Sequence, residues 1–386
     1  MKRLKLFLLV SLVIIISSGI GSSFPLSSPS QKNSSLAPLK NSAKATSFSS
    51  KEGVFISGRQ LLVHGEPFIM KGICYSPVRK GGNFPEDLMI NNPTEKDLAV
   101  IQHDFQMMHA AGINTIRTYF PIIDSRILKL LTKYQLRTIV PVLSSHQTSF
   151  QNLSSTITLL KNHPSTLIWE IGNEWDINFF YSKKMDLKHP QGLGFQDSLK
   201  LVKNSAAYIK LLDKRHPVST GVSARVLKNR SHLAQLAQLD SVDLFGINIY
   251  HGLSFGNRLD QWASHMKKPL YIGECGADAF NTLINAEDDA SQEIATRCLI
   301  TEILNNLSAV NPKNVLIGGC IFEWNDEWWK DPNGSPLTHD NGGIVAPGEG
   351  PYPDYVFNEE WWGIVDIDRH PRPAYTTLKK LYLKNR

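Results

Sequence analysis

Cysteine is scarce in this 386-residue chain, and the four cysteines match no metal-binding spacing. Cys74, Cys275 and Cys320 each lie in or directly after an apolar run, which favours buried free thiols over disulfide bridges. The chain also lacks a phosphate-binding loop, a cluster of metal ligands and the Ser, His and Asp order of a catalytic triad. We therefore expect no metal ion and no other cofactor.

A concentrated basic region is also missing. The net charge of +6 is spread along the chain, and the only Lys/Arg cluster is MKRLK at the N-terminus. No nucleic-acid partner is therefore expected. Hydrophobic residues at 42% and charged residues at 20% are ordinary values for a globular protein with a large core.

The N-terminal apolar run, at 6–16, is shorter than the ~20 residues needed to span a bilayer. It follows MKRLK and precedes the small residues SSGIGSS, a pattern that predicts a signal peptide over 1–23. We expect a secreted, periplasmic or cell-surface protein without a stable membrane span after processing. No Ala-x-Ala cleavage site is evident, so an uncleaved N-terminal anchor stays the alternative. Residues 24–52 are rich in Ser, Asn, Lys and Pro and predict a disordered linker.

From residue 53 onward, short apolar runs alternate with helical patterns. The segment VFISGRQLLVHGEPFIMKGICYSP predicts a β-hairpin that leads into a first strand. Helices are predicted at 95–111, 195–215 and 290–307. Eight strands alternating with helices favour a (β/α)8 TIM barrel, and the first turn lacks the GxGxxG of an open doubly wound sheet. The predicted strands are 68–74, 115–118, 138–143, 167–171, 217–220, 242–250, 270–273 and 315–324.

In such a barrel the chemistry is located at the C-terminal ends of the strands. Polar or aromatic residues lie at the end of six of the predicted strands or just after it, and each taken alone is more often a rim residue than a catalyst. Glu170 precedes its strand end, and we interpret it as a buried strand residue that needs a partner. The strand-end candidates are Arg117, His146, Asn173, Glu174, Asn248, Tyr250, Glu274 and Trp324.

Two of these candidates, Glu174 and Glu274, end the fourth and seventh strands, which face each other across the barrel. Cleavage of a glycosidic bond requires one protonated and one ionised carboxyl group. Desolvation beside Trp175 would keep Glu174 protonated, and Arg117 with Tyr250 would keep Glu274 ionised. The sequence therefore predicts a glycosidase.

Five motifs together resemble the clan A retaining glycoside hydrolases, and most closely the catalytic TIM barrel of glycoside hydrolase family 2. They are WEIGNEW, IGECGAD, NTIRTYFP, FGINIYH and the closing WWGIVDIDRHPRPAY. Some resemblance to families 5, 17 and 72 is also present, in the last two through KGICYSPVRKGG. The sandwich domains that precede a family 2 barrel are absent from the sequence, and Cys275 stands where an aromatic residue is common.

The resemblance implies a catalytic domain over 53–386 that cleaves β-glycosidic bonds of an oligo- or polysaccharide by double displacement. It implies Glu174 as acid/base and Glu274 as nucleophile, with substrate contacts or support from Asn173, Arg117, Tyr250, Asn248 and His146, and with Trp324 as a floor for the sugar ring. Two alternatives stay open. One is a β-glucan transglycosylase resembling the glucanosyltransferases, and the other is a carbohydrate-binding barrel without catalysis.

Overall fold

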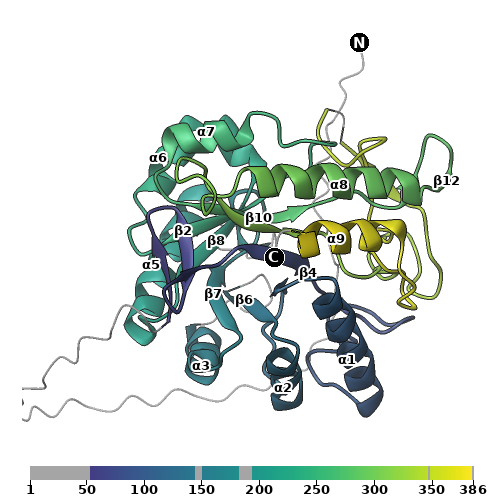
Figure 1. The fold of residues 1–386 in the computed structure, drawn as a ribbon, viewed down its shortest axis with the longest axis horizontal. Helices are drawn as coiled ribbons and strands as arrows, with labels where there is room; N and C mark the ends of the chain where they lie inside the picture. Colours follow the sequence, from purple (N-terminus) through teal and green to yellow (C-terminus); the bar gives the residue numbers. More distant parts are fainter. Residues whose placement is uncertain (1–52, 144–149, 182–193, 347, 385–386) are drawn as a thin grey trace, which may run out of the picture.

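Eight parallel strands close into a barrel in the computed structural model, which describes residues 53–143, 150–181, 194–346 and 348–384 (Figure 1). Each strand is hydrogen-bonded to the next along the chain, and the last pairs with the first. Every one of them overlaps a predicted strand, so the predicted (β/α)8 barrel is confirmed. In order they are β4 (Met70–Cys74), β5 (Thr115–Arg117), β6 (Arg137–Leu143), β7 (Thr166–Ile171), β8 (Val218–Ser223), β9 (Leu244–Asn248), β10 (Leu270–Cys275) and β13 (Leu316–Ile321).

Burial explains why these segments read as nearly continuous apolar runs. Seven of the eight strands are buried at every position, and β6 is buried at all but its first. Parallel strands are covered by helices outside and by side chains inside the barrel. Figure 1 shows the helices around the strands: α1 (Glu95–Ala110), α2 (Ser125–Lys133), α3 (Phe150–Leu160), α5 (Phe195–Leu212), α6 (Arg230–Ala237), α7 (Arg258–His265), α8 (Asp289–Asn305) and α9 (Pro373–Lys384).

The predicted N-terminal hairpin is present as β1 (Val54–Ser57) and β2 (Gln60–Val63), and a short β3 (Glu66–Pro67) extends it to three antiparallel strands. Two small hairpins that the sequence did not predict lie in the last two connections. They are β11 (Phe280–Asn281) with β12 (Ala286–Glu287), and β14 (Gly343–Val345) with β15 (Val356–Asn358). Within the described ranges, no helix has the length and apolar character to cross a membrane. The predicted signal peptide and linker lie outside the described residues.

Candidate active site

One rim of the barrel collects most of the predicted site residues, because the carboxyl ends of parallel strands meet at the same edge. β5 and β9 end in a site residue, β7 is followed after one glycine by two of them, and β10 supplies one next to its last residue. The structure brings together Arg117, Asn173, Glu174, Asn248, Tyr250 and Glu274. Their functional roles stay predictions.

Glu174 stands at a sharp turn between β7 and the short helix α4 (Trp175–Asn178). Its backbone is left-handed, with φ 49° and ψ 32°, a conformation that costs free energy in a residue other than glycine. The next residue supports the turn, because Trp175 is fully buried and its indole N–H donates to Thr220 Oγ1 at 2.8 Å. The apolar strand and the buried tryptophan therefore fix the position of a half-buried carboxyl group at the rim.

The Glu274 carboxylate accepts three hydrogen bonds from its neighbours. Oε1 accepts from Arg117 Nη1 at 2.8 Å and from the Tyr119 hydroxyl at 2.7 Å, and Oε2 accepts from the Tyr250 hydroxyl at 3.0 Å. Burial and then nearby negative charges raise the pKa of Tyr119 and Tyr250 above the ordinary value, so both phenols stay protonated donors. Three donors, one of them cationic, therefore bind this carboxylate and fix its orientation.

Asn173 is oriented by two hydrogen bonds to the same atom. Its side-chain oxygen accepts from Arg117 Nη2 at 2.9 Å and from Asn248 Nδ2 at 3.1 Å. Because both donors occupy the oxygen side of the planar amide, the NH2 group is directed the other way and can donate to a ligand. This orientation fits the predicted contact between Asn173 and a sugar hydroxyl.

Glu174 is in a different electrostatic environment. Desolvation, then the negative charges of Glu274 and Asp176, raise its pKa to about 8, against a hydrogen bond from Asn248 and the charge of Arg117. Asp176 is buried, and its carboxylate accepts from the backbone N–H and the hydroxyl of Ser223, at 2.8 and 2.7 Å. The rim thus holds one carboxyl group that burial and nearby charges keep protonated at neutral pH, beside one that accepts hydrogen bonds from three donors.

The predicted sugar floor at Trp324 is wrong, because this side chain is 0% exposed. Its ring packs against Tyr375 of helix α9, with the ring centres 6.1 Å apart, and so presents no free face to a ligand. The aromatic residue next to the cluster is Phe322, which directly follows β13 and stands edge to face with Tyr250 at 6.3 Å. The strand ends three residues earlier than the prediction, so the aromatic at the strand end is Phe322.

Two further residues contact Arg117 of the cluster: Tyr119, which was not assigned from the sequence, and Glu170, which was not assigned to the site. Tyr119 lies two residues after Arg117, the spacing that returns a side chain to the same face of an extended segment, and this was the available signal. Glu170 was expected to need a partner, and the structure supplies Arg117 and Tyr271. The candidate His146 lies outside the described residues.

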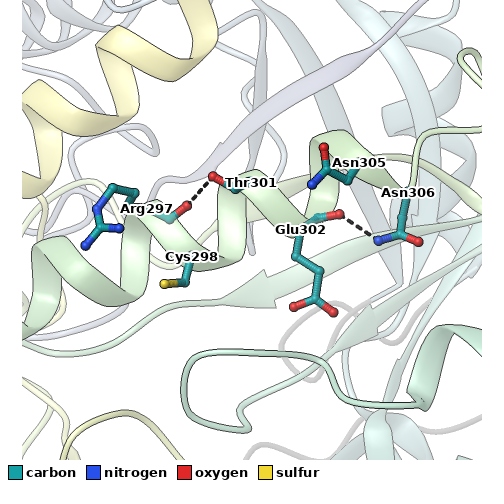
Figure 2. Close-up of a pocket in the computed structure, with 6 residues that line it drawn as sticks. All are labelled: Arg297, Cys298, Thr301, Glu302, Asn305 and Asn306. Atoms are coloured by element: carbon teal, nitrogen blue, oxygen red, sulfur yellow. Dashed lines mark hydrogen bonds between the residues drawn. The ribbon is translucent and has the colours of Figure 1, made fainter.

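Within the described parts of the chain, no group of three or more His, Cys, Asp or Glu side chains could hold a metal ion. A hollow of about 350 Å³ is lined by residues of the outer helix α8 and by the residue that follows it. Figure 2 shows its residues on that helix and at its C-cap, where the Thr301 hydroxyl and the Asn306 amide donate to helix carbonyls at 2.7 and 2.9 Å. The hollow contains none of the rim residues, and the candidate site is therefore the Arg117–Glu274 cluster.

Comparisons with known proteins point to the same type of barrel, although no family model matches the chain. The β-glucuronidase of Felis catus is 21% identical over 361 residues, which cover 86% of this chain and 49% of that protein. The β-glucuronidase of Homo sapiens is 20% identical over 357 residues, with the same two coverages. The chain spans about half the length of the curated relatives it matches.

Solved structures agree at the level of the fold. A galacturonate-bound GH2 β-galacturonidase from Eisenbergiella tayi matches with a TM-score of 0.57 and 20% identity, over 86% of this chain and 54% of that chain. A Bacteroides uniformis β-glucuronidase 2, covalently bound to cyclophellitol-6-carboxylate aziridine, matches with a TM-score of 0.57 and 18% identity, over 86% and 37%. These similarities confirm the barrel and the predicted resemblance to glycoside hydrolase family 2.

Proposed function

We propose that this chain is a retaining β-glycosidase of the family 2 type, with Glu174 as acid/base and Glu274 as nucleophile. The observation that supports it best is the pair of carboxyl groups at one rim, one with a pKa of about 8 and the other bound by three donors. Their separate environments match the division of labour that glycosidic cleavage requires. The names of the relatives, β-glucuronidases and a β-galacturonidase, agree with this class.

In the first step, a Glu274 oxygen attacks the anomeric carbon and the bond to the leaving oxygen breaks. Glu174 gives its proton to that oxygen, so the leaving group departs as an alcohol. Arg117, Tyr119 and Tyr250 hold the attacking carboxylate in place before the reaction. The Asn173 amide can bond a sugar hydroxyl near the reacting carbon.

In the second step, the now ionised Glu174 takes a proton from water, whose oxygen attacks the anomeric carbon. The ester bond to Glu274 breaks and its carboxylate is regenerated. Two displacements at the same carbon return the original β configuration. The proposed substrate is a β-linked oligo- or polysaccharide. If a sugar hydroxyl attacks in place of water in the second step, the same site catalyses transglycosylation.

The experiment that tests this function is a screen of 2,4-dinitrophenyl β-glycosides, including glucoside, mannoside, galactoside, glucuronide and galacturonide, followed by ¹H NMR of the first product. We expect at least one to be cleaved, with the β anomer appearing before mutarotation. An α anomer as first product would mean inversion. Release from none of these, and from no β-glucan or mannan oligosaccharide, would contradict the proposal.

The pH dependence is a second prediction. The proton on Glu174 is required, so kcat/KM for an unactivated glycoside should be high below pH 8 and fall as the pH rises through about 8. Asp176→Asn removes a negative charge that raises the pKa of Glu174, and the basic limb should then move to lower pH. The full pH profile of both proteins measures this. A basic limb at the same pH in Asp176→Asn would contradict the assignment.

A further inference from the structure

Glu170 is a buried carboxylate of β7 that lies four residues before Glu174 and is 2% exposed. Both its oxygens accept from Arg117 Nε of β5, at 3.1 and 3.0 Å. Its Oε1 also accepts from the Tyr271 hydroxyl of β10 at 2.5 Å, and that hydroxyl is bonded to Ser219 of β8 at 3.0 Å. These buried side chains form one hydrogen-bond network that joins four strands of the barrel.

The contacts of Arg117 show what this carboxylate controls. Its guanidinium group is planar, and its N–H groups point in fixed directions. Glu170 holds the Nε edge, while Nη1 donates to Glu274 and Nη2 donates to Asn173. Because the group is rigid, fixing one edge fixes the direction of the two remaining nitrogens. Glu170 therefore determines where Arg117 points, although it touches neither of those two residues through a hydrogen bond in the structure.

Glu170 also stabilises the buried positive charge of Arg117. Arg117 is 0% exposed, so its cation depends on protein partners. Burial acts to lower the pKa of Arg117, and Glu170 is foremost among the neighbours whose charge raises it well above the ordinary value. When Glu274 forms an ester with the sugar, its negative charge disappears. Without Glu170, the buried guanidinium would then have no carboxylate hydrogen-bonded to it, which is unfavourable.

We propose that Glu170 is a positioning residue: it keeps Arg117 aimed at Glu274 and Asn173, and it pairs Arg117 while Glu274 is bound to the sugar. The proposal rests on the glycosidase function proposed above. Besides Glu170, six titratable or charged groups lie near Glu274 and interact with its charge. They are Cys74, Arg117, Tyr119, Glu174, Tyr250 and Cys275. Of the carboxylates bonded to Arg117, Glu170 is the one that the reaction leaves charged.

The decisive variant is Glu170→Gln, which removes the charge and nearly keeps the shape. Its side-chain carbonyl can still accept from Arg117 and Tyr271. We expect kcat/KM for the 2,4-dinitrophenyl glycoside that the wild type cleaves best to fall at least about tenfold. We also expect the acidic limb of the pH profile of kcat/KM to move to lower pH, because a negative charge beside the rim cluster is gone.

Two control variants separate positioning from a merely structural role. Tyr271→Phe removes the neutral hydroxyl that donates to the Glu170 carboxylate, and no charge changes. The acidic limb of this variant should therefore stay at its wild-type pH. Glu170→Asp keeps the negative charge, but its shorter side chain no longer reaches Arg117 in the same geometry. We therefore expect kcat/KM to fall while the acidic limb stays at its wild-type pH. A folded Glu170→Gln protein with wild-type rate and wild-type acidic limb overturns the inference. If Glu170→Gln does not fold, a folded Glu170→Asp protein with full kcat/KM overturns it instead.

The failure of this inference and the failure of the proposed function give different results. If the wild-type protein cleaves no glycoside of the screen, the proposed function is wrong. If the wild-type protein cleaves a glycoside and the Glu170→Gln protein behaves in the same way, only the proposed role of Glu170 is wrong. Thermal unfolding of each variant shows whether a loss of rate reflects loss of the fold.

Discussion

Glu274→Ala is expected to lower kcat/KM at least about a thousandfold for every β-glycoside that the wild type cleaves, whatever the leaving group. The change removes the atom that bonds the anomeric carbon, and a better leaving group does not replace a nucleophile. The fold should survive, because Arg117 still has Glu170 as a partner at 3.0 Å. Initial rates on a 2,4-dinitrophenyl glycoside and on the unactivated oligosaccharide measure the effect, with thermal unfolding as a check on the fold.

A glutamate of the outer helical layer provides the matched control for this variant. Glu302 of helix α8 accepts a hydrogen bond from the backbone N–H of Phe255 at 3.1 Å, and it lies outside the rim cluster. Glu302→Ala should keep the wild-type rate on both substrates. If Glu274→Ala retained most of its activity, Glu274 would be a structural rim carboxylate, and the nucleophile would have to be sought elsewhere.

The barrel could be predicted from the sequence because each strand is buried on both faces. That burial makes most of the strands largely apolar, and these segments alternate with helical periods. The small hairpins β11–β12 and β14–β15 were not predicted. Their strands are two or three residues long, and β12 is exposed at both positions, so neither burial nor alternation leaves a readable pattern.

The strand ends were harder to predict than the strands. After Ile321 the sequence continues with Phe322 and Trp324, so apolar character alone does not show where β13 stops. The structure turns at that point and sends Trp324 into the contact with Tyr375. The residue directly after this strand is Phe322 and not the predicted Trp324, which packs against Tyr375 of α9, about 50 residues further along the chain.

Long-range partners set the other limit. The sequence placed Arg117 near Glu274 because both end strands of one barrel, and the 2.8 Å contact agrees. It gave no means of pairing Glu170 with Arg117 and Tyr271, which are 53 and 101 residues away. Such a pairing depends on which side chains meet inside the closed barrel, and this follows from the register of several strands together.

Glu174→Ala should affect substrates unequally, in contrast to Glu274→Ala. A 2,4-dinitrophenolate leaves without a proton, so the first step should survive on that glycoside, whereas an unactivated glycoside needs the acid and should stall. The second step lacks its base in both cases, so the glycosyl-enzyme should accumulate. A fast burst of dinitrophenolate followed by slow turnover, with the sugar mass on Glu274 in intact-protein mass spectrometry, is the expected observation.

Azide then separates the two glutamates by the stereochemistry of the product. In Glu174→Ala, azide needs no base and attacks the trapped ester from the face that the glutamate vacated, so turnover should rise and give a β-glycosyl azide. In Glu274→Ala, azide replaces the missing nucleophile and attacks the substrate directly, so the product should be the α anomer. ¹H NMR of the two azides measures this difference. Equal losses on activated and unactivated substrates in both variants, with no azide product from either, would show that neither glutamate takes part in glycosyl transfer.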